Sequence, residues 1–509
     1  MIVFRADASS TIGGGHIYRC LTLAHAIKRQ QAEQQKSNQE VLFVCHLSQG
    51  HMADLIKDQG FEILTVEQPL SVIEMRQILI ELQQQHTIDW LIIDHYQINV
   101  HYQKQLKPLV KNVMVIDDLA NRAHHCDLLF DQSLNRHPSD YQPWLTNNDC
   151  GIICGSQFAL LREEFGQLKP MAKLIRQNFK AINKVLIAIS ATDPDNISGQ
   201  IIAELEKLPA NDTSKNWQYT VVITSKSSHI QSLKQQVIQS PLNIALQIDV
   251  SNMAEIMLKH DIAIAAAGGA MLERCAMGLP SIIIGVVDNQ DHNICELQKA
   301  KVAIHVMDKS ELADKLNNTI IELENIDPQQ YKTIADSAFR LCHGDGADYV
   351  AGQLHIKNHF HNDYLQTVTQ AHCELIFNWQ QHPKTRAFSR NPNPPTWDEH
   401  QHWFTQTIEN EQVDFYLLMH QGKPAGFVRL NPKPVEDQPD AKEVSIAIAP
   451  ECHGKGLGVI ALNLLTTLHK GSKLLAFIDT NNIASVKAFE RAGFKPHSQT
   501  DDGNWYQYK

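Results

Sequence analysis

This sequence lacks several features that would assign it to a broad class of protein. Basic residues are not in excess: 45 Lys and Arg stand against 56 Asp and Glu, and the formal net charge is −11. With no basic block to neutralise phosphates, we expect no nucleic-acid partner. No apolar run approaches the roughly 18 residues that span a bilayer. The first ten residues contain the charged Arg5 and lack the apolar core of a signal peptide. We therefore expect a cytoplasmic protein with no membrane partner.

The cysteines do not occur at the spacings typical of metal-binding sites. The ten cysteines are scattered, and the close pair Cys150 and Cys154 has no second pair at zinc-site spacing. His124 and His125 adjoin Cys126 and resemble a ligand cluster, but no H-E-x-x-H pattern accompanies them. Buried free thiols and no bound metal are therefore the expectation.

Short β-rich runs alternate with amphipathic segments through much of the chain. Alternation of this kind predicts parallel, doubly wound sheets. It occurs twice, with 165–180 as the connecting segment. The first set of predicted strands covers 1–6, 40–47, 90–96, 112–117 and 127–131. The second set covers 181–190, 217–224, 243–249, 261–267, 280–287 and 301–306.

The alternation of predicted strands and helices stops near residue 345. A Pro/Asn-rich stretch at 389–404 is expected to be a loop, and 414–431 reads as an antiparallel pair with the turn QGKP. A strand, a glycine loop and a helix follow at 442–470, which indicates an α+β domain. The predicted division is a first α/β domain (1–160), a second (161–350), a linker (351–364) and the α+β domain (365–509).

The second α/β domain contains a candidate nucleotide site. Gly268 and Gly269 follow a predicted strand and precede a helix, which leaves helix amides free for an anion. Glu273 lies on the first turn of that helix, where a carboxylate can accept two ribose hydroxyls. Asn289 and Gln290 follow the next strand and are expected to face the same crevice. The alternative is an ordinary turn with a solvated glutamate. The complete arrangement resembles the UDP-sugar site of GT-B enzymes such as the N-acetylglucosaminyl transferase of peptidoglycan synthesis.

The glycine loop near the N-terminus carries a histidine. Gly13 and Gly15 fit a dinucleotide fingerprint, but Tyr18 occupies the third glycine position, and no Lys-Ser/Thr follows as in a P-loop. What is left is a flexible loop that delivers His16 to the start of a helix. There the helix dipole favours a neutral imidazole that can act as a base. The alternative is a histidine that merely caps the helix.

Several motifs, in order, give a more specific resemblance. The stretches RADASSTIGGGHIYRCLTLA, LIIDHYQI, HHCDLLFDQ, ALLREEF and GGAMLERCAMGLP resemble the UDP-2,4-diacetamido-2,4,6-trideoxy-β-L-altropyranose hydrolases of pseudaminic acid synthesis, over roughly residues 1–350. The resemblance implies a GT-B-like pair of Rossmann-type domains in which water attacks C1 with inversion and UDP leaves. The implied catalytic residues are His16, as the base, and Tyr96. The implied substrate residues are Arg5, Asp7, Gly15, Thr192, Gly268, Gly269, Glu273, Asn289 and Gln290.

One segment departs from the family pattern. The family usually has a glycine pair before Thr-Asp, whereas this chain has Ser190 and Ala191 before Thr192. Side chains there restrict the approach of backbone to a diphosphate. The departure weakens Thr192 as a phosphate contact and leaves His16 unaffected.

The third domain carries a second glycine loop. Successive amides between a strand and a helix can cradle a pyrophosphate. Together with NNIASVKAFERAGF (481–494), the loop resembles motifs A and B of the GNAT acetyltransferases. The resemblance implies acetyl-CoA as co-substrate, bound by His453, Gly454, Lys455, Gly456, Leu457, Gly458, Asn482 and Ser485.

Two further positions bear on that chemistry. Phe489 stands where many relatives have the tyrosine that protonates CoA thiolate, so the acid lies elsewhere, with Tyr506 and Tyr508 as candidates. Glu443 is a candidate proton relay from the substrate ammonium; a solvated carboxylate is the alternative.

Together the resemblances imply a bifunctional enzyme. The acetyltransferase would acetylate a UDP-4-amino-sugar, and the hydrolase would then release UDP from the product. The alternative is a GT-B glycosyltransferase that uses a UDP-sugar, with a GNAT domain that only binds or senses acetyl-CoA. The sequence leaves the oligomeric state and the sugar stereochemistry open.

Overall fold

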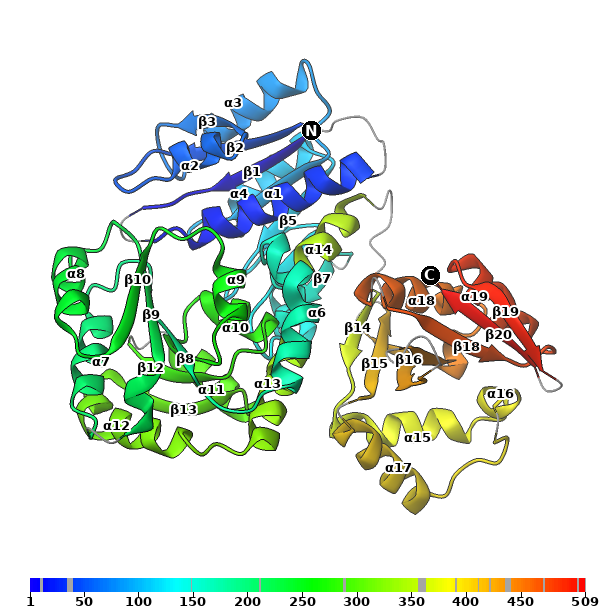
Figure 1. Ribbon diagram of the computed structural model, residues 1–509. Coiled ribbons are helices and arrows are strands. Elements are labelled where there is room, and N and C mark those ends of the chain that lie inside the picture. The colour runs from blue at the N-terminus through cyan, green and yellow to red at the C-terminus, as the bar shows by residue number, and fades with distance from the viewer. Residues whose placement is uncertain are drawn as a thin grey trace. The chain divides into compact units, whose positions relative to one another are not determined.

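The computed structural model forms two compact units, the larger made mainly of residues up to 355 and the smaller mainly of residues from 356 onward (Figure 1). The structure describes residues 1–9, 12–33, 40–147, 149–209, 212–286, 290–355, 363–389, 391–410, 412–420, 423–434, 441–469, 472–500 and 503–508.

A seven-stranded sheet forms the first half of the larger unit. Its order is β3-β2-β1-β4-β5-β6-β7, and β1 pairs in parallel with β2 and β4. The direction of winding therefore reverses between β1 and β4. The strands are β1 (Ile2–Ala6), β2 (Val41–His46), β3 (Glu62–Val66), β4 (Trp90–Asp94), β5 (Asn112–Ile116), β6 (Leu128–Asp131) and β7 (Gly151–Cys154). The sequence predicted all of them except β3 and β7.

Amphipathic helices connect these strands. On α1 the fully buried apolar residues recur at helical spacing, with Ile17, Cys20, Leu21, Ala24 and Ile27 on one face. This face explains why the segment after the glycine loop folds as a helix on the sheet. The helices are α1 (Gly15–Glu33), α2 (Ala53–Asp58), α3 (Val72–Gln83), α4 (Val100–Leu106) and α5 (Pro138–Tyr141).

A six-stranded parallel sheet forms the second half of that unit. Its order is β10-β9-β8-β11-β12-β13, with the winding reversed between β8 and β11. The strands are β8 (Lys184–Ala188), β9 (Gln218–Ile223), β10 (Asn243–Ile248), β11 (Ile262–Ala266), β12 (Ser281–Gly285) and β13 (Ala303–Asp308). The helices are α6 (Glu163–Gln177), α7 (Ile197–Glu206), α8 (Ile230–Gln239), α9 (Met253–Leu258), α10 (Ala270–Ala276), α11 (Asp291–Lys299), α12 (Leu312–Leu323), α13 (Pro328–Leu341) and α14 (Gly346–His355).

Helix α14 returns to the first sheet and lies against α1 (Figure 1). Arg29 of α1 contacts Asp348 at 2.8 Å, and Trp90 Nε1 donates to the Leu354 carbonyl at 2.9 Å. The last helix of the second half is therefore part of the packing of the first half.

The smaller unit contains a mostly antiparallel sheet in the order β14-β15-β16-β17-β18-β20-β19, in which β17 and β18 are parallel. The strands are β14 (Tyr364–Thr367), β15 (Asp414–His420), β16 (Lys423–Pro432), β17 (Lys442–Ile448), β18 (Leu474–Ile478), β19 (Lys495–Thr500) and β20 (Gly503–Tyr508). The helices are α15 (Cys373–Gln381), α16 (Pro383–Arg386), α17 (Trp397–Glu409), α18 (Leu457–Leu468) and α19 (Ile483–Arg491).

The prediction of a loop over 389–404 is wrong in its second half, because α17 begins at Trp397. Thr396 caps that helix: its side chain accepts from the Glu399 amide, and Glu399 accepts from the Thr396 amide in return. The prolines before Thr396 hid this start signal.

Candidate active site

The reversal point of the first sheet brings several charged side chains together. Asp94 is the last residue of β4, and Asp118 follows β5, so the carboxyl ends of two neighbouring parallel strands place both carboxylates at one edge. His16 and Arg19 reach the same edge from the first turns of α1, three residues apart on one helix face.

The glycine loop directs the chain into α1. Gly13 has a φ of +79°, which an L side chain rarely adopts, and its amide donates to the Ser9 carbonyl at 2.8 Å. A Cβ on Gly14 would lie 2.5 Å from Met52 Sδ, whereas a Cβ on Gly15 would meet nothing within 4 Å. His16 is the second residue of the helix and only 5% exposed. The loop therefore ends in a fixed, buried imidazole.

His16 lies in an ion network with two partners. Its Nδ1 is 2.5 Å from Asp94 Oδ1, and Arg19 contacts the same carboxylate through Nε at 2.5 Å and Nη2 at 2.6 Å. Burial opposes ionisation of Asp94, but the Arg19 guanidinium and the His16 contact hold its pKa at about 2. Asp94 is therefore a charged acceptor at neutral pH.

Tyr96 forms the outer wall of this network. Its ring meets the His16 ring edge-on at 4.7 Å between centroids, and its hydroxyl donates to Asp118 Oδ2 at 3.1 Å. Arg19 Nη1 contacts the same oxygen at 2.9 Å. Burial and the charge of Asp118 raise the pKa of Tyr96 to about 12, so the phenol stays protonated. Tyr96 is 41% exposed and can meet a ligand.

Arg5 and Asp7 form a separate, buried pair. Arg5 Nη1 lies 2.6 Å from Asp7 Oδ1, and His95 Nε2 lies 3.2 Å from Asp7 Oδ2. The His46 amide also donates to Asp7. Burial opposes the charge on Asp7, whereas His95 and Arg5 hold its pKa below the usual range. Both residues of the pair are less than 4% exposed. In this structure both side chains are therefore bonded to other residues of the chain.

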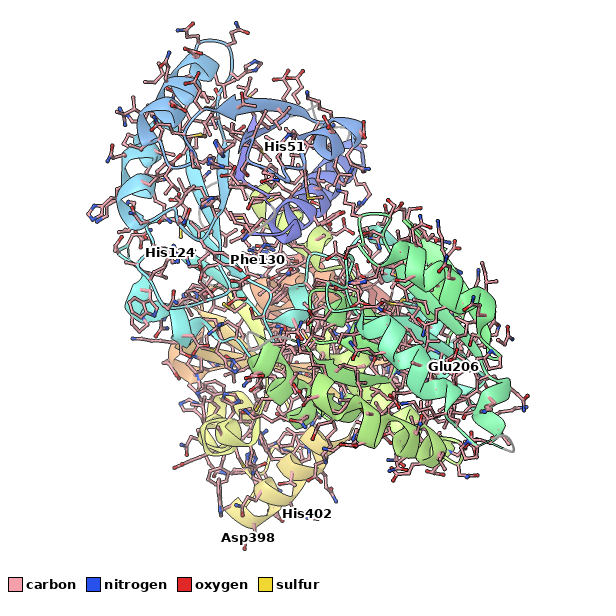
Figure 2. The ribbon with its side chains drawn as sticks, turned by 90° about the vertical axis from the view of Figure 1, so that its left-hand side faces the viewer. His51, His124, Phe130, Glu206, Asp398 and His402 are labelled. Atoms are coloured by element: carbon pink, nitrogen blue, oxygen red, sulfur yellow. The ribbon has the colours of Figure 1, made fainter. Side chains whose placement is uncertain are left out.

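His124 lies beside a different aspartate from the one that His16 contacts. His124, labelled in Figure 2, is fully buried with Nε2 3.7 Å from Asp117 Oδ1. The Tyr141 hydroxyl lies 2.9 Å from Asp117 Oδ2 and 2.8 Å from Asp131 Oδ2 and donates its one proton to either of them. Among the described residues, no group of three or more His, Cys, Asp or Glu side chains is placed to hold a metal ion. Within the same residues, no helix combines the length and apolar character needed to cross a membrane.

Sequence reasoning missed Asp94, Arg19 and Asp118. Two signals were available: Asp94 closes an apolar strand two residues before Tyr96, and Arg19 follows His16 by one helical turn. Neither signal says that the two segments meet, because 75 residues separate Arg19 from Asp94 along the chain.

The second sheet holds the predicted nucleotide residues at its own reversal point. Thr192 follows β8 and is exposed, while Gly268 and Gly269 follow the neighbouring strand β11. A Cβ on Gly269 would meet nothing within 4 Å, and one on Gly268 would meet only Gln290 Nε2, at 3.9 Å. The structure therefore brings Gly268 and Gln290 together and leaves open space beside both glycines.

Glu273 lies on α10, just beyond these glycines. Its side chain is 22% exposed, with Oε1 3.7 Å from Arg162. Burial raises the pKa of Glu273, and the positive charge of Arg162 partly offsets this rise. The predicted residue Asn289 lies outside the described residues.

The smaller unit presents the glycine loop at the start of α18. His453 to Gly456 are exposed, Leu457 is buried, and His453 Nε2 contacts the Ile448 carbonyl at 2.9 Å. Gly454 and Gly456 have φ values of +80° and +76°, and a Cβ on either would meet nothing within 4 Å. The loop is thus open, with a backbone conformation that favours glycine.

Strands β17 and β18 diverge beside this loop. Their parallel register covers only Lys442 with Leu474 and Glu443 with Leu475, although each strand continues beyond that pair. The remaining length of β17 therefore faces a gap in the sheet at the loop end.

The other predicted residues of this unit take the following positions. The Asn482 side chain caps α19 by accepting from the Ser485 amide at 3.1 Å. Phe489 is buried against Phe494, with ring centroids 4.9 Å apart. Tyr506 is buried, whereas Tyr508 is half-buried beside Gly493.

Two family models match parts of this chain. The family model described as "Glycosyltransferase family 28 C-terminal domain" matches residues 177–344, and the model described as "Acetyltransferase (GNAT) domain" matches residues 364–495. The Campylobacter jejuni UDP-2,4-diacetamido-2,4,6-trideoxy-β-L-altropyranose hydrolase is 30% identical over 299 residues, covering 58% of this chain and 96% of that protein.

Two further proteins match over longer stretches. An uncharacterized Methanocaldococcus jannaschii protein is 22% identical over 515 residues, covering 99% of this chain and 98% of that protein. The crystal structure of Acinetobacter baumannii MurG matches with a TM-score of 0.48 and 13% identity, covering 69% of this chain and 98% of that one. The sheet orders and the family matches confirm the predicted fold class, a pair of doubly wound domains followed by an α+β GNAT domain.

Proposed function

Because this chain belongs to the UDP-2,4-diacetamido-2,4,6-trideoxy-β-L-altropyranose hydrolase family and also carries a GNAT domain, we propose that it both removes UDP from a diacetamido-trideoxy hexose and acetylates the amino-sugar precursor. At the coarser level it is a UDP-sugar-processing enzyme with an acetyltransferase domain. The observation that carries the hydrolase proposal is the contact of His16 with Asp94 inside the Arg19 network.

His16 is the general base of the hydrolysis. Asp94 is ionised and can only accept, so the proton of the neutral imidazole lies on Nδ1 and the lone pair lies on Nε2. Nε2 removes a proton from water, whose oxygen attacks C1 of the sugar. The C1–O bond breaks with inversion, and its electron pair leaves with UDP. Arg19 binds the same carboxylate through Nε and Nη2, which holds Asp94 in place beside His16.

The nucleotide binds in the second half of the larger unit. The open backbone beside Gly268 and Gly269 suits a diphosphate, and the Glu273 carboxylate suits the ribose hydroxyls. The family match over 177–344 supports this placement. Thr192 and Gln290 flank the same edge, and Asn289 is proposed from the family pattern alone.

The smaller unit uses acetyl-CoA. The open loop from His453 to Gly458 suits the pyrophosphate, and the gap between β17 and β18 gives the thioester access to the sheet. The sugar amine attacks the thioester carbonyl, the C–S bond breaks, and CoA leaves with a proton. The acetylated UDP-sugar is then the substrate of the hydrolase.

The test is to supply a UDP-4-amino-sugar and acetyl-CoA to the full chain and to measure CoA and UDP by chromatography. We expect both to be released, with CoA first. His16→Ala should lower UDP release by about 10²- to 10⁴-fold while CoA release continues. His101→Ala, which removes an exposed histidine from α4, is the matched control.

Three outcomes would contradict the proposal. UDP release that survives His16→Ala removes the base assignment. UDP release that requires an added sugar acceptor makes the front half a glycosyltransferase. Acetyl-CoA that binds without turnover on any UDP-amino-sugar makes the GNAT domain a binding module.

A further inference from the structure

The GNAT sheet has two unlike faces. Val428 and Leu430 of β16 and Val444 of β17 are buried on one face. The opposite face is mixed: Phe427 of β16 and Leu475 of β18 are buried there, whereas its other residues are half-buried and largely polar or aromatic. The residues of this polar face are Arg429 and Asn431 of β16, Glu443 and Ser445 of β17, Phe477 of β18, and Trp505 and Gln507 of β20.

Arg429 is the least satisfied charge on the polar face. Its guanidinium carbon lies 5.0 Å from the centroid of the Trp403 ring of α17, and its Nε is buried with no hydrogen-bond partner among the described residues. Burial lowers its pKa, and Glu443 partly offsets this. A half-buried guanidinium that lies against an aromatic ring, with no carboxylate bonded to it, has donors available for an anion.

Other charged side chains on the polar face affect how tightly an anion can bind there. Lys433 Nζ lies 3.8 Å from Glu443 Oε2 and 5.0 Å from the centroid of the Trp505 ring. Two cations and one carboxylate therefore line the polar face, with Trp403 and Trp505 beside the cations. This pattern suits a ligand that combines an anion with an amine.

The polar face borders the proposed acetyl-CoA gap. Glu443 occupies the last paired position of β17 with β18, and Ser445 lies two residues beyond, where the two strands have diverged. An amine bound near Glu443 would therefore lie beside β17, the strand that also borders the gap. Glu443 is placed to take the proton that the ammonium must lose before it attacks the thioester.

We propose that the polar face is the acceptor site of the acetyltransferase and that Arg429 binds the diphosphate of a nucleotide-linked amino sugar. The inference rests on the proposed function and extends it. Once UDP has been removed, the sugar no longer carries the anion that Arg429 recognises. Arg429 therefore makes the chain acetylate before it hydrolyses.

The kinetic test compares CoA release with the UDP-linked amino sugar and with the same amino sugar free of UDP. For Arg429→Gln we expect the KM of the UDP-linked substrate to rise about tenfold or more, because charge-assisted contacts are lost, while kcat changes little. The KM of the free sugar should not change. Arg429→Lys should restore part of the affinity, because it keeps the charge without the fork. Lys423→Gln, which removes a positive charge from the exposed start of the same strand, is the control.

A binding test separates this inference from the proposed function. In a His16→Ala background with unacetylated CoA, which prevents both reactions, calorimetry should detect two equivalents of the UDP-linked amino sugar per chain. Arg429→Gln should remove one of them. A single equivalent in the parent chain, or two in the Arg429→Gln chain, overturns the inference. Absence of CoA release from wild type with both equivalents bound would instead overturn the acetyltransferase proposal.

Discussion

The two proposed reaction sites of this chain differ in how complete they are. Around His16 the charged groups are paired within the chain: Asp94 contacts His16 and Arg19, and Arg19 also contacts Asp118. In the smaller unit the proposed binding groups lack such pairing. Gly454 has empty space beside it, and Arg429 Nε is buried without a hydrogen-bond partner among the described residues. The first pattern fixes a proton acceptor, and the second leaves room and donors for ligands.

The difference follows from what each site is proposed to do. A general base must hold one tautomer and one orientation throughout the reaction, which requires ionised partners that are present before the substrate arrives. A site that recognises phosphate obtains part of its charge balance from the ligand itself. The comparison predicts that substitutions near His16 affect both stability and turnover, while substitutions in the glycine loop mainly affect binding.

The largest expected effect is that of Asp94→Asn. The carboxylate accepts from both sides, whereas an amide has one acceptor oxygen and one donor group. It therefore cannot accept from His16 and from Arg19 Nε together. We expect kcat for UDP release to fall by about 10²- to 10⁴-fold, with a smaller change in KM. Asp54→Asn, on the exposed face of α2, should leave kcat unchanged. Retained turnover in Asp94→Asn would show that the open and the paired sites do not differ in this way.

The acid dependence of stability is the next largest effect. The folded-state pKa of Asp94 is about 2, below its unfolded value of about 3.9, so its contribution to stability is fully present above that unfolded value. It is lost as the pH falls through the folded value. The contribution is on the order of 2 kcal/mol. In urea unfolding, the difference between wild type and Asp94→Asn should shrink as the pH falls from about 5 to 2. A difference that is constant with pH would contradict the assignment.

Gly456→Ala should have a smaller effect, confined to the open site. A φ of +76° strains an alanine by about 1–2 kcal/mol. The new Cβ also occupies space that the loop keeps empty. We expect weaker acetyl-CoA binding by calorimetry and an unchanged rate of UDP release. In Gly458→Ala the new Cβ meets Ala488 Cβ at an ordinary 3.6 Å, so thermal stability should not fall.

Thr396→Ala should have the smallest effect. It removes the side-chain cap of α17 and costs about 1 kcal/mol. Because α17 carries Trp403, which lies against Arg429, binding of the UDP-linked amino sugar should weaken slightly as well. Thermal unfolding of the full chain measures the stability change, and Thr396→Ser should restore it. A loss of UDP release in Thr396→Ala would contradict the independence of the two sites.

Local sequence patterns predicted most strands of the two parallel sheets but missed elements with weak patterns. Strand β3 was missed because it lies at the sheet edge and exposes Glu62, Leu64 and Thr65, which breaks the buried run expected of a central strand. Strand β7 has only four residues. Helix α17 was missed because the prolines before Thr396 masked its capping signal, although Thr396 and Glu399 stand at the spacing of a capping box.

The fold class, the likeness to the hydrolase and GNAT families, and His16 as the candidate base could all be predicted from the sequence. Each of these is written in local order: strand-helix alternation, glycine loops, and a histidine at a helix start. The folded structure alone shows that His16 and Arg19 contact one carboxylate, that of Asp94, and that Arg429 lies against Trp403. Each of these contacts joins residues of a strand and a helix, which meet only once the sheets and the helices packed on them have formed.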